Sequence, residues 1–435
     1  MKSRRLGRII LWLIILLIAF SIAVLFGAFR SESIAPQAKE PLAADEMKLL
    51  VDKGRELVMA GDCMGCHSQP QGPQGAGGVA IGTPFGTIYS TNITPDKEHG
   101  IGNYSRADLH RVLRDGIAPG NRNLYPAMPF VFTHITTPDD IDAIYAYLMS
   151  IEPMKVPNQD NTGVFRLPVR PFMNFWTLLN FPDRQAPVEE DRSELWTRGA
   201  YLVEGLGHCA ACHTPRNFMM GVDFARNLEG GEVDGLDIPN ITAQELAKRG
   251  FDVSILTQYL QTGIAPQGTS FAGMHTVTHF STSAMQEHDV EAIATYLLTD
   301  SQGRVPEPQP APEPLAAAAD PAPDSDMEVG RRMYLASCAG CHGMEGEGIP
   351  NVSPALHGNA IIAMDSPRDT IDVVLNGIPT ERFTGYKRMY AMPPFAHRLS
   401  DEEVADLVTW VRAEWGGQAQ PVAVAEVEAM EKAVH

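Results

Sequence analysis

Apolar residues recur at helical spacing in several parts of the chain. In segment 139–148 they stand at Ile141, Ile144, Tyr145 and Leu148, three or four residues apart. Two later segments have the same pattern: 288–298 and 401–411. Short helices are also expected further upstream, in three segments that begin with glycine: 54–58, 199–203 and 330–334. The pattern therefore predicts a mostly α-helical protein.

The most apolar stretch of the chain runs from Ile9 to Phe29, with Ser21 as its polar interruption. Arg4, Arg5 and Arg8 precede it. A run of this length is enough to cross a bilayer, and the arginines favour the cytoplasmic side. We predict a transmembrane helix within residues 1–30, with the rest of the chain exported. The alternative is a cleaved signal peptide, which has a shorter apolar run and a small-residue cleavage site.

The remainder of the chain repeats one pattern three times. Each copy has a glycine-led helix, a Cys-x-x-Cys-His string, a Gly-Ile string and a closing helix. The Gly-Ile strings are Gly116-Ile117-Ala118-Pro119, Gly263-Ile264-Ala265-Pro266 and Gly377-Ile378-Pro379. Each copy is long enough to close its own core. We therefore predict three tandem globular domains: residues 45–151, 193–300 and 327–416.

Two connectors of different composition join the domains. Residues 301–326 are mostly Pro, Ala, Asp and Glu and predict a semi-stiff spacer, which would hold the third domain by a tether. Residues 152–192 are aromatic-rich, with Phe172, Phe175 and Trp176 at their centre. These side chains pack on the flanking domains or form a contact surface for a partner subunit or the membrane. Residues 417–435 are left as a C-terminal tail.

The charge of the chain excludes one class of partner. The formal net charge is −19, whereas binding of nucleic acid requires clustered Lys and Arg. The acidity either serves solubility or provides a docking surface for a basic partner.

All six cysteines stand in the three Cys-x-x-Cys-His strings, a pattern that indicates covalent c-type haem attachment. Two thiols add to the haem vinyl groups, and the following His binds the iron. The attachment cysteines would be Cys63, Cys66, Cys209, Cys212, Cys338 and Cys341, and the proximal ligands His67, His213 and His342. Zinc sites instead pair two Cys-x-x-Cys strings across roughly 12–20 residues, much closer than here. A thioredoxin-like redox site would not need three copies that each precede His.

A methionine as sixth iron ligand would favour electron transfer, because it raises the potential and leaves no open position. Met128 follows His67 by as many residues as Met274 follows His213. Met392 stands in a string, Tyr-Ala-Met-Pro-Pro-Phe, that closely matches the one around Met128. We predict Met128, Met274 and Met392 as the ligands. Rivals remain near the last two: Met285, His275 and His279 for the second haem, and Met389 for the third.

With these strings in place, the chain resembles the triple-haem cytochrome c subunits of bacterial membrane-bound periplasmic dehydrogenases. The resemblance rests on the strings at 61–67, 83–96, 124–129, 392–396, 399–401 and 415–416, and extends over residues 49–422. The second domain departs from the family pattern, with Ala272-Gly273-Met274 where Gly-Pro-Met is expected. The alcohol dehydrogenase subunits usually begin with a cleavable signal peptide, which this chain does not clearly have.

The resemblance implies three class I cytochrome c domains with three covalently bound haem c groups. The partner would be a dehydrogenase catalytic subunit that uses molybdopterin, flavin or a quinone cofactor to oxidise alcohols, aldehydes or sugars. Electrons would leave to ubiquinone or a terminal oxidase. The predicted location is the inner membrane, in contact with lipid, with the haem domains in the periplasm. Two alternatives remain: a free-standing multihaem carrier, and a haem peroxidase, in which one iron would lack its Met.

Overall fold

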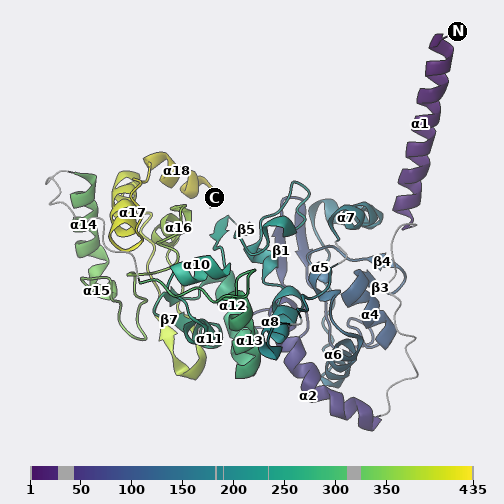
Figure 1. Cartoon of the computed structure of the whole chain (residues 1–435), viewed down its shortest axis with the longest axis horizontal. Coiled ribbons are helices and arrows are strands. Elements are labelled where there is room, and N and C mark those ends of the chain that lie inside the picture. Colours follow the sequence, from purple (N-terminus) through teal and green to yellow (C-terminus); the bar gives the residue numbers. More distant parts are fainter. Residues whose placement is uncertain are drawn as a thin grey trace. The chain divides into compact units, whose positions relative to one another are not determined.

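The computed structural model describes residues 2–27, 44–181, 184–189, 191–233, 235–310 and 325–433. Helices dominate, and the strands are short (Figure 1). The chain forms two compact units. The first consists of residues 1–187, 204–208 and 218–221, and the second of the other residues from 188 onward. The prediction of a mostly α-helical protein is confirmed.

The first unit contains the elements up to residue 180. They are α1 (Lys2–Leu25), α2 (Ala44–Ala60), α3 (Cys63–His67), β1 (Ala80–Thr83), β2 (Gly86–Tyr89), α4 (Arg106–Asp115), β3 (Ile117–Ala118), β4 (Arg122–Asn123), α5 (Phe130–Thr133), α6 (Pro138–Ser150), η1 (Gly163–Arg166), η2 (Arg170–Phe172) and α7 (Met173–Asn180).

The second unit contains the later elements, except for Glu204 at the end of α8. Its first part, up to residue 297, has α8 (Glu194–Glu204), α9 (Ala210–His213), η3 (Phe224–Arg226), β5 (Gly231–Val233), β6 (Leu236–Ile238), α10 (Ala243–Lys248), α11 (Val253–Thr262), β7 (Ile264–Ala265), β8 (Gly268–Thr269), α12 (Ala272–Phe280), η4 (Thr282–Ala284) and α13 (Glu287–Leu297). Its last part has α14 (Asp326–Ser337), α15 (Ala339–His342), α16 (Arg368–Asn376), β9 (Glu381–Arg382), η6 (Thr384–Tyr386), β10 (Arg388–Met389), α17 (Asp401–Trp415) and α18 (Val424–Ala433).

The three predicted closing helices are confirmed as α6, α13 and α17. Each contacts the helix that precedes the Cys-x-x-Cys-His string, and a glycine lies at each contact. A Cβ on Gly54, Gly199 or Gly330 would stand 1.9, 2.0 or 2.2 Å from a carbonyl oxygen of the closing helix. Only glycine allows the two backbones to approach this closely. The repeated glycines of the sequence are therefore explained by one repeated helix crossing.

The repeated Gly-Ile strings also have a common structural cause. Gly116, Gly263 and Gly377 end α4, α11 and α16 with φ of 64°, 72° and 69°. Residues with a side chain rarely adopt this left-handed conformation, and glycine is the usual residue just past a helix end. The chain then pairs with itself in an antiparallel arrangement: β3 with β4, β7 with β8, and Ile378 with Met392.

The hydrophobic core of the last part of the chain lies between α14, α16, α17 and α18. Tyr334 is fully buried there, and its ring lies 5.1 Å from that of Trp410 and 4.8 Å from that of Trp415. The segment predicted only as a C-terminal tail contains α18, whose Val427 is fully buried in this core. α18 is therefore a structural part of the last domain.

The predicted transmembrane helix is wrong. No helix within the described residues is long and apolar enough to cross a membrane. α1 begins in the charged sequence before Ile9 and ends at Leu25, so its apolar part extends about 25 Å at 1.5 Å per residue, less than the ~30 Å hydrocarbon core of a bilayer. Its last turn packs on α7, where Asn174 Nδ2 donates to the Leu25 carbonyl at 2.8 Å. The inner-membrane location predicted from this anchor loses its basis.

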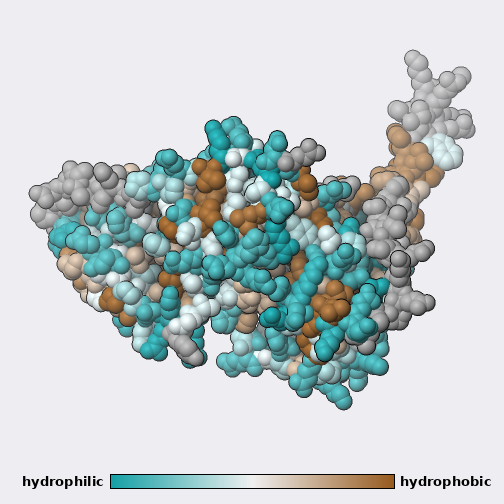
Figure 2. Space-filling model, turned by 60° about the horizontal axis from the view of Figure 1, so that its bottom comes forward, coloured by the Kyte–Doolittle hydropathy of each residue, from teal (hydrophilic) through white to brown (hydrophobic). Residues whose placement is uncertain are grey.

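The aromatic connector is partly core and partly surface. Trp176 is only 9% exposed, packs edge-on against Phe130 and donates to the Met219 carbonyl at 2.9 Å. Phe172 and Leu179, in contrast, are 55% and 67% exposed. Figure 2 shows a largely hydrophilic visible face on which hydrophobic residues form separate patches. Packing on the flanking domain is therefore seen for Trp176, whereas Phe172 and Leu179 stay exposed and the contact surface remains a prediction.

The second and third predicted domains pack against each other within the second unit. Arg368 of α16 lies 3.1 Å from Glu232 and 3.6 Å from Asp237, on the β5–β6 hairpin. Asp369 accepts a hydrogen bond from the Asp237 N–H at 2.8 Å. The third domain is thus held by direct contacts as well as by the 301–326 connector, of which residues 311–324 lie outside the described part.

Candidate haem sites

Each Cys-x-x-Cys-His string forms a short helix: α3, α9 and α15. In each string the first cysteine is half-buried and the second is exposed. Burial raises the pKa of Cys63 to about 12 and that of Cys338 to about 11. The structure brings the paired thiols and the histidine together in all three places, as the motif predicts.

The three histidines share one orientation. Nδ1 of His67 lies 2.6 Å from the Thr91 carbonyl oxygen, Nδ1 of His213 lies 2.7 Å from that of Pro239, and Nδ1 of His342 lies 3.0 Å from that of Pro354. A carbonyl only accepts hydrogen bonds, so Nδ1 carries the proton and Nε2 keeps its lone pair. This arrangement is typical of metal-binding histidines, whose second nitrogen is held by a backbone carbonyl.

The protonation state of these histidines suits iron binding. Burial lowers the pKa of His67, His213 and His342, and the hydrogen bond to the carbonyl opposes this only in part. Each imidazole is therefore neutral near pH 7, which is the form that binds a metal.

The carbonyl partners were not predicted, although the sequence contains a signal for two of them. Thr91 precedes the string Asn92-Ile93-Thr94, and Pro239 precedes the matching string 240–242. In both strings the asparagine Oδ1 accepts hydrogen bonds from the N–H and the hydroxyl of the threonine, at 2.7–2.9 Å. The repeated string therefore builds the turn that holds the carbonyl in place. Pro354 lies in a different sequence, so no such signal marks it.

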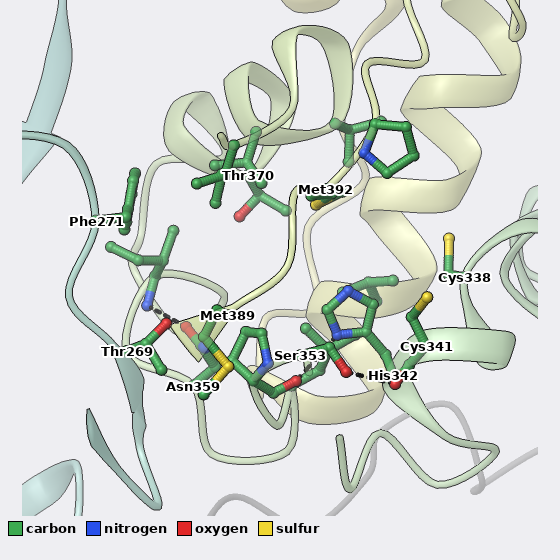
Figure 3. A pocket seen from close by; sticks show the side chains of 18 of the residues that line it. Thr269, Phe271, Cys338, Cys341, His342, Ser353, Asn359, Thr370, Met389 and Met392 are labelled. Atoms are coloured by element: carbon green, nitrogen blue, oxygen red, sulfur yellow. Dashed lines mark hydrogen bonds between the residues drawn. The ribbon is translucent and has the colours of Figure 1, made fainter. Parts of the chain in front are cut away.

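A large apolar cavity lies beside the third string (Figure 3). Cys338, Cys341 and His342 line it together with apolar residues of α16 and α17, among them Val374, Leu407, Val408 and Val411. Two lining residues, Thr269 and Phe271, come from the second domain. Figure 3 shows them on a different chain segment from His342, on the other side of the cavity.

The predicted methionines lie in different settings. Met392 lines the cavity, and its N–H and carbonyl bond to Ile378 at 2.9 and 3.1 Å. Its rival Met389 lines the same cavity, in β10. Met128 packs on the core cluster that Cys63 also contacts. Met274 lies in the first turn of α12, while its rival Met285 is only 9% exposed beyond η4.

The donor set fits haem c. The thiol pairs, the neutral Nε2 and the apolar wall in the third domain are what a covalently held porphyrin requires, and no cluster of three or more His, Cys, Asp or Glu in the described residues could hold a bare metal ion. When bound, the haem supplies an iron that changes between the ferric and ferrous states.

Comparison with known proteins supports this fit. The family described as "Cytochrome c" matches residues 51–152, and the family described as "Cytochrome C oxidase, cbb3-type, subunit III" matches residues 325–411. Both matches contain a Cys-x-x-Cys-His string, at 63–67 and 338–342. The domains that carry these strings therefore hold covalently bound haem c.

Curated relatives match most of the chain. A nicotinate dehydrogenase subunit of Pseudomonas putida is 38% identical over 412 residues, 90% of this chain, but the chain spans only 33% of that longer protein. The gluconate 2-dehydrogenase cytochrome c subunit of Pantoea cypripedii is 35% identical, with 87% of this chain and 88% of the relative covered. The cytochrome c subunit of the quinone alcohol dehydrogenase of Gluconobacter oxydans is also 35% identical, with 87% and 81% covered. The chain therefore belongs to the family of dehydrogenase cytochrome c subunits, which transfer electrons and leave substrate chemistry to another subunit.

Proposed function

We propose that this chain binds three haem c groups and passes electrons between them, from a dehydrogenase catalytic subunit to ubiquinone or a terminal oxidase. The observation that carries the proposal is the threefold recurrence of one arrangement, a thiol pair with a histidine whose Nδ1 faces a backbone carbonyl. The relatives named as gluconate and alcohol dehydrogenase subunits support a partner that oxidises a sugar acid or an alcohol.

The proposed role of each residue follows from its chemistry. Cys63, Cys66, Cys209, Cys212, Cys338 and Cys341 hold the haems through thioethers. His67, His213 and His342 present Nε2 to the iron, and the carbonyls fix their rings. Met128, Met274 and Met392 supply the sixth ligand, which raises the potential and closes the iron to other ligands. The apolar side chains that line the cavity of the third site would exclude water there and keep the change in solvation small when an electron arrives.

Denaturing mass spectrometry of the mature protein tests the number of haems. The expected mass is that of the polypeptide plus three haem groups, since thioether bonds survive denaturation. His213→Ala is a useful companion, because it keeps both thiols: it should change the spectrum of one haem, while the variant polypeptide still carries the added mass of three haems. A mature protein with two haems or fewer would refute the proposal. A wild-type protein with an open iron that reacts with peroxide would favour the peroxidase alternative.

An apolar surface of the first unit supports docking to a catalytic subunit. Phe172, Leu178, Leu179, Phe218 and Met220 are 43–95% exposed. Trp176 donates to the carbonyl of Met219, which places α7 beside the 218–220 segment. Aromatic and methionine side chains are enriched at the centres of interfaces. We therefore assign this patch, which combines exposed connector residues with Phe218 and Met220, as the surface that meets the partner, and not the buried Trp176.

Replacing Phe172, Leu179 and Phe218 together with Ser should release the catalytic subunit from the purified complex while all haems stay bound. The matched control is Phe85→Ser, which removes another exposed aromatic (55% exposed) outside the patch. Co-purification by the triple variant at the wild-type level would contradict the assignment. Release by Phe85→Ser alone would move the interface to the β1–β2 hairpin.

A further inference from the structure

The helix that carries Met274 lacks an N-terminal cap of its own. α12 begins at Ala272, and Phe271 before it offers no side-chain hydrogen bond. Ala272 has φ of +48°, a conformation that residues with a side chain rarely adopt. The first N–H groups of a helix have no partner within the helix and require one from outside. α12 therefore needs external support at the end where Met274 lies.

That support comes from the third domain. Burial raises the pKa of Glu381 of β9 to about 7, and the backbone N–H of Ala272 opposes that rise. Its side chain is largely buried, and its Oε2 lies 3.8 Å from Nδ1 of His275 in the same helix. A carboxylate at a helix N-terminus also interacts favourably with the helix dipole. Glu381 thus takes the place of the missing cap, more than a hundred residues further along the chain.

A second contact from the same segment fixes the position of α12. The ring of Phe383 lies 5.0 Å from that of His275, edge to face. Phe383 also covers the end of α11, because a Cβ on Gly263 would lie 2.7 Å from its ring. The 381–383 segment therefore contacts both the end of α11 and the start of α12.

The other two predicted methionine ligands do not depend on another domain in this way. Met128 and Met392 are each followed by proline, which fixes the backbone after the ligand. Met392 also pairs with Ile378 of its own domain. Met274 has neither a following proline nor such a backbone pairing. His275 follows it, and the pairing of β7 with β8 ends at Thr269.

We infer that Glu381 is a positioning residue for the second haem: it holds the start of α12 from the third domain and thereby places Met274 on the iron. This inference rests on the proposed assignment of Met274 as the sixth ligand. It explains how the second domain keeps a ligand without the Gly-Pro-Met string. It also means that ligation of the second haem depends on docking of the third domain.

Two measurements on the full-length haem protein test this inference. Glu381→Ala removes the acceptor, so the amides at 272–275 should exchange with deuterium about tenfold faster, the scale of a lost helix cap. The same variant should lose about one third of the methionine-to-iron absorption and bind carbon monoxide at one haem. Glu381→Gln keeps an oxygen acceptor and should restore both properties. Glu402→Ala, an exposed carboxylate at the start of α17, is the control and should change neither.

Met274→Ala distinguishes a failure of the positioning role of Glu381 from a failure of the assignment of Met274 as the iron ligand. If Met274→Ala lowers the absorption while Glu381→Ala leaves it at the wild-type level, the ligand stands and the positioning role is refuted. Faster exchange in Glu381→Ala with unchanged absorption also refutes it, because Glu381 would then be a helix cap only. If Met274→Ala itself changes nothing, the failure belongs to the proposed ligand.

Should Glu381→Ala fail to fold, Glu381→Asp decides the question. It keeps the charge but draws the carboxylate back by one methylene, away from the Ala272 N–H. Reduced methionine-to-iron absorption in a protein with three haem masses supports the inference. The wild-type absorption in this variant overturns it.

Discussion

The second and third domains solve the same structural problem with different means. Met392 lies in a segment that bonds to Ile378 of its own domain and continues into two prolines. Met274 lies at the start of a helix that Glu381 of the neighbouring domain contacts, with Glu381 Oε2 3.8 Å from His275 Nδ1. The third domain thus fixes its predicted ligand locally, whereas the second relies on a tertiary contact. Repeats with equivalent motifs can therefore differ in whether each domain fixes its methionine ligand without help from its neighbour.

Substitutions at the helix crossings of the second and third domains should reveal this difference most strongly. Gly330→Ala places a Cβ 2.2 Å from the Asp406 carbonyl, and Gly199→Ala places one 2.0 Å from that of Ala292. Each should cost about 3 kcal/mol through overpacking. Gly330→Ala should weaken methionine ligation at the second and third haems, but Gly199→Ala mainly at the second. Carbon monoxide titration of the ferrous proteins counts the open haems.

The control for these variants is Gly340→Ala. Gly340 is exposed, a Cβ there meets no atom within 4 Å, and the second domain has Ala211 at the matching place. Its free energy of unfolding should stay within about 0.5 kcal/mol of wild type. Equal numbers of open haems in Gly330→Ala and Gly199→Ala would show that the two domains are equally autonomous.

Replacing the ligand itself should have a more local effect. Met392→Ala should open the third haem to carbon monoxide and lower its potential on the order of 100 mV, since a thioether favours ferrous iron. The second haem should keep its spectrum, because Glu381 and Phe383 remain in place. Potentiometric titration followed by absorption measures both. Met389→Leu is the matched control, and a lower potential in that variant would make Met389 the ligand.

The smallest effect is expected at the salt-bridged contact between the two domains. Burial raises the pKa of Asp369 to about 6, and the hydrogen bond from the Asp237 N–H opposes this rise only in part. A group with a raised pKa binds its proton more tightly in the folded protein, so its contribution to stability is lost as the pH rises from about 4 to about 6. Asp369→Asn keeps an oxygen acceptor for the Asp237 N–H and should flatten this pH dependence.

Denaturation of wild type and Asp369→Asn at pH 4.5 and pH 7 measures the difference, with Glu402→Gln as the control for an exposed carboxylate outside this contact. Parallel pH profiles in wild type and Asp369→Asn would assign the titration to another group.

Features that depend on local sequence were predictable. The spacing of Ile141, Ile144 and Leu148 predicts α6 because only a helix brings these residues to one side. The Cys-x-x-Cys-His strings predict the haem attachment sites because both thiols and the imidazole must lie on one short turn. The glycines at the helix crossings were visible as repeats, although their reason became clear only from the structure.

Features that depend on tertiary contacts were not predictable in the same way. The length of an apolar run does not reveal that α1 ends at Leu25 against Asn174. Nothing in the sequence near Ala272 indicates that its partner is Glu381. α18 was missed because glutamates interrupt its apolar residues, so its buried Val427 has no clear pattern around it.

The tryptophan pair of the third domain gives the protein an internal optical reporter. Trp410 and Trp415 lie 5.1 Å apart, and both contact Tyr334, which lines the cavity beside Cys338. A haem in that cavity absorbs at tryptophan emission wavelengths and would quench their fluorescence by energy transfer. The fluorescence of Trp410 and Trp415 would therefore be visible in folded chains that have not yet acquired this haem. It would be quenched in mature chains. Fluorescence could thus follow the assembly of the third haem in real time, without a label.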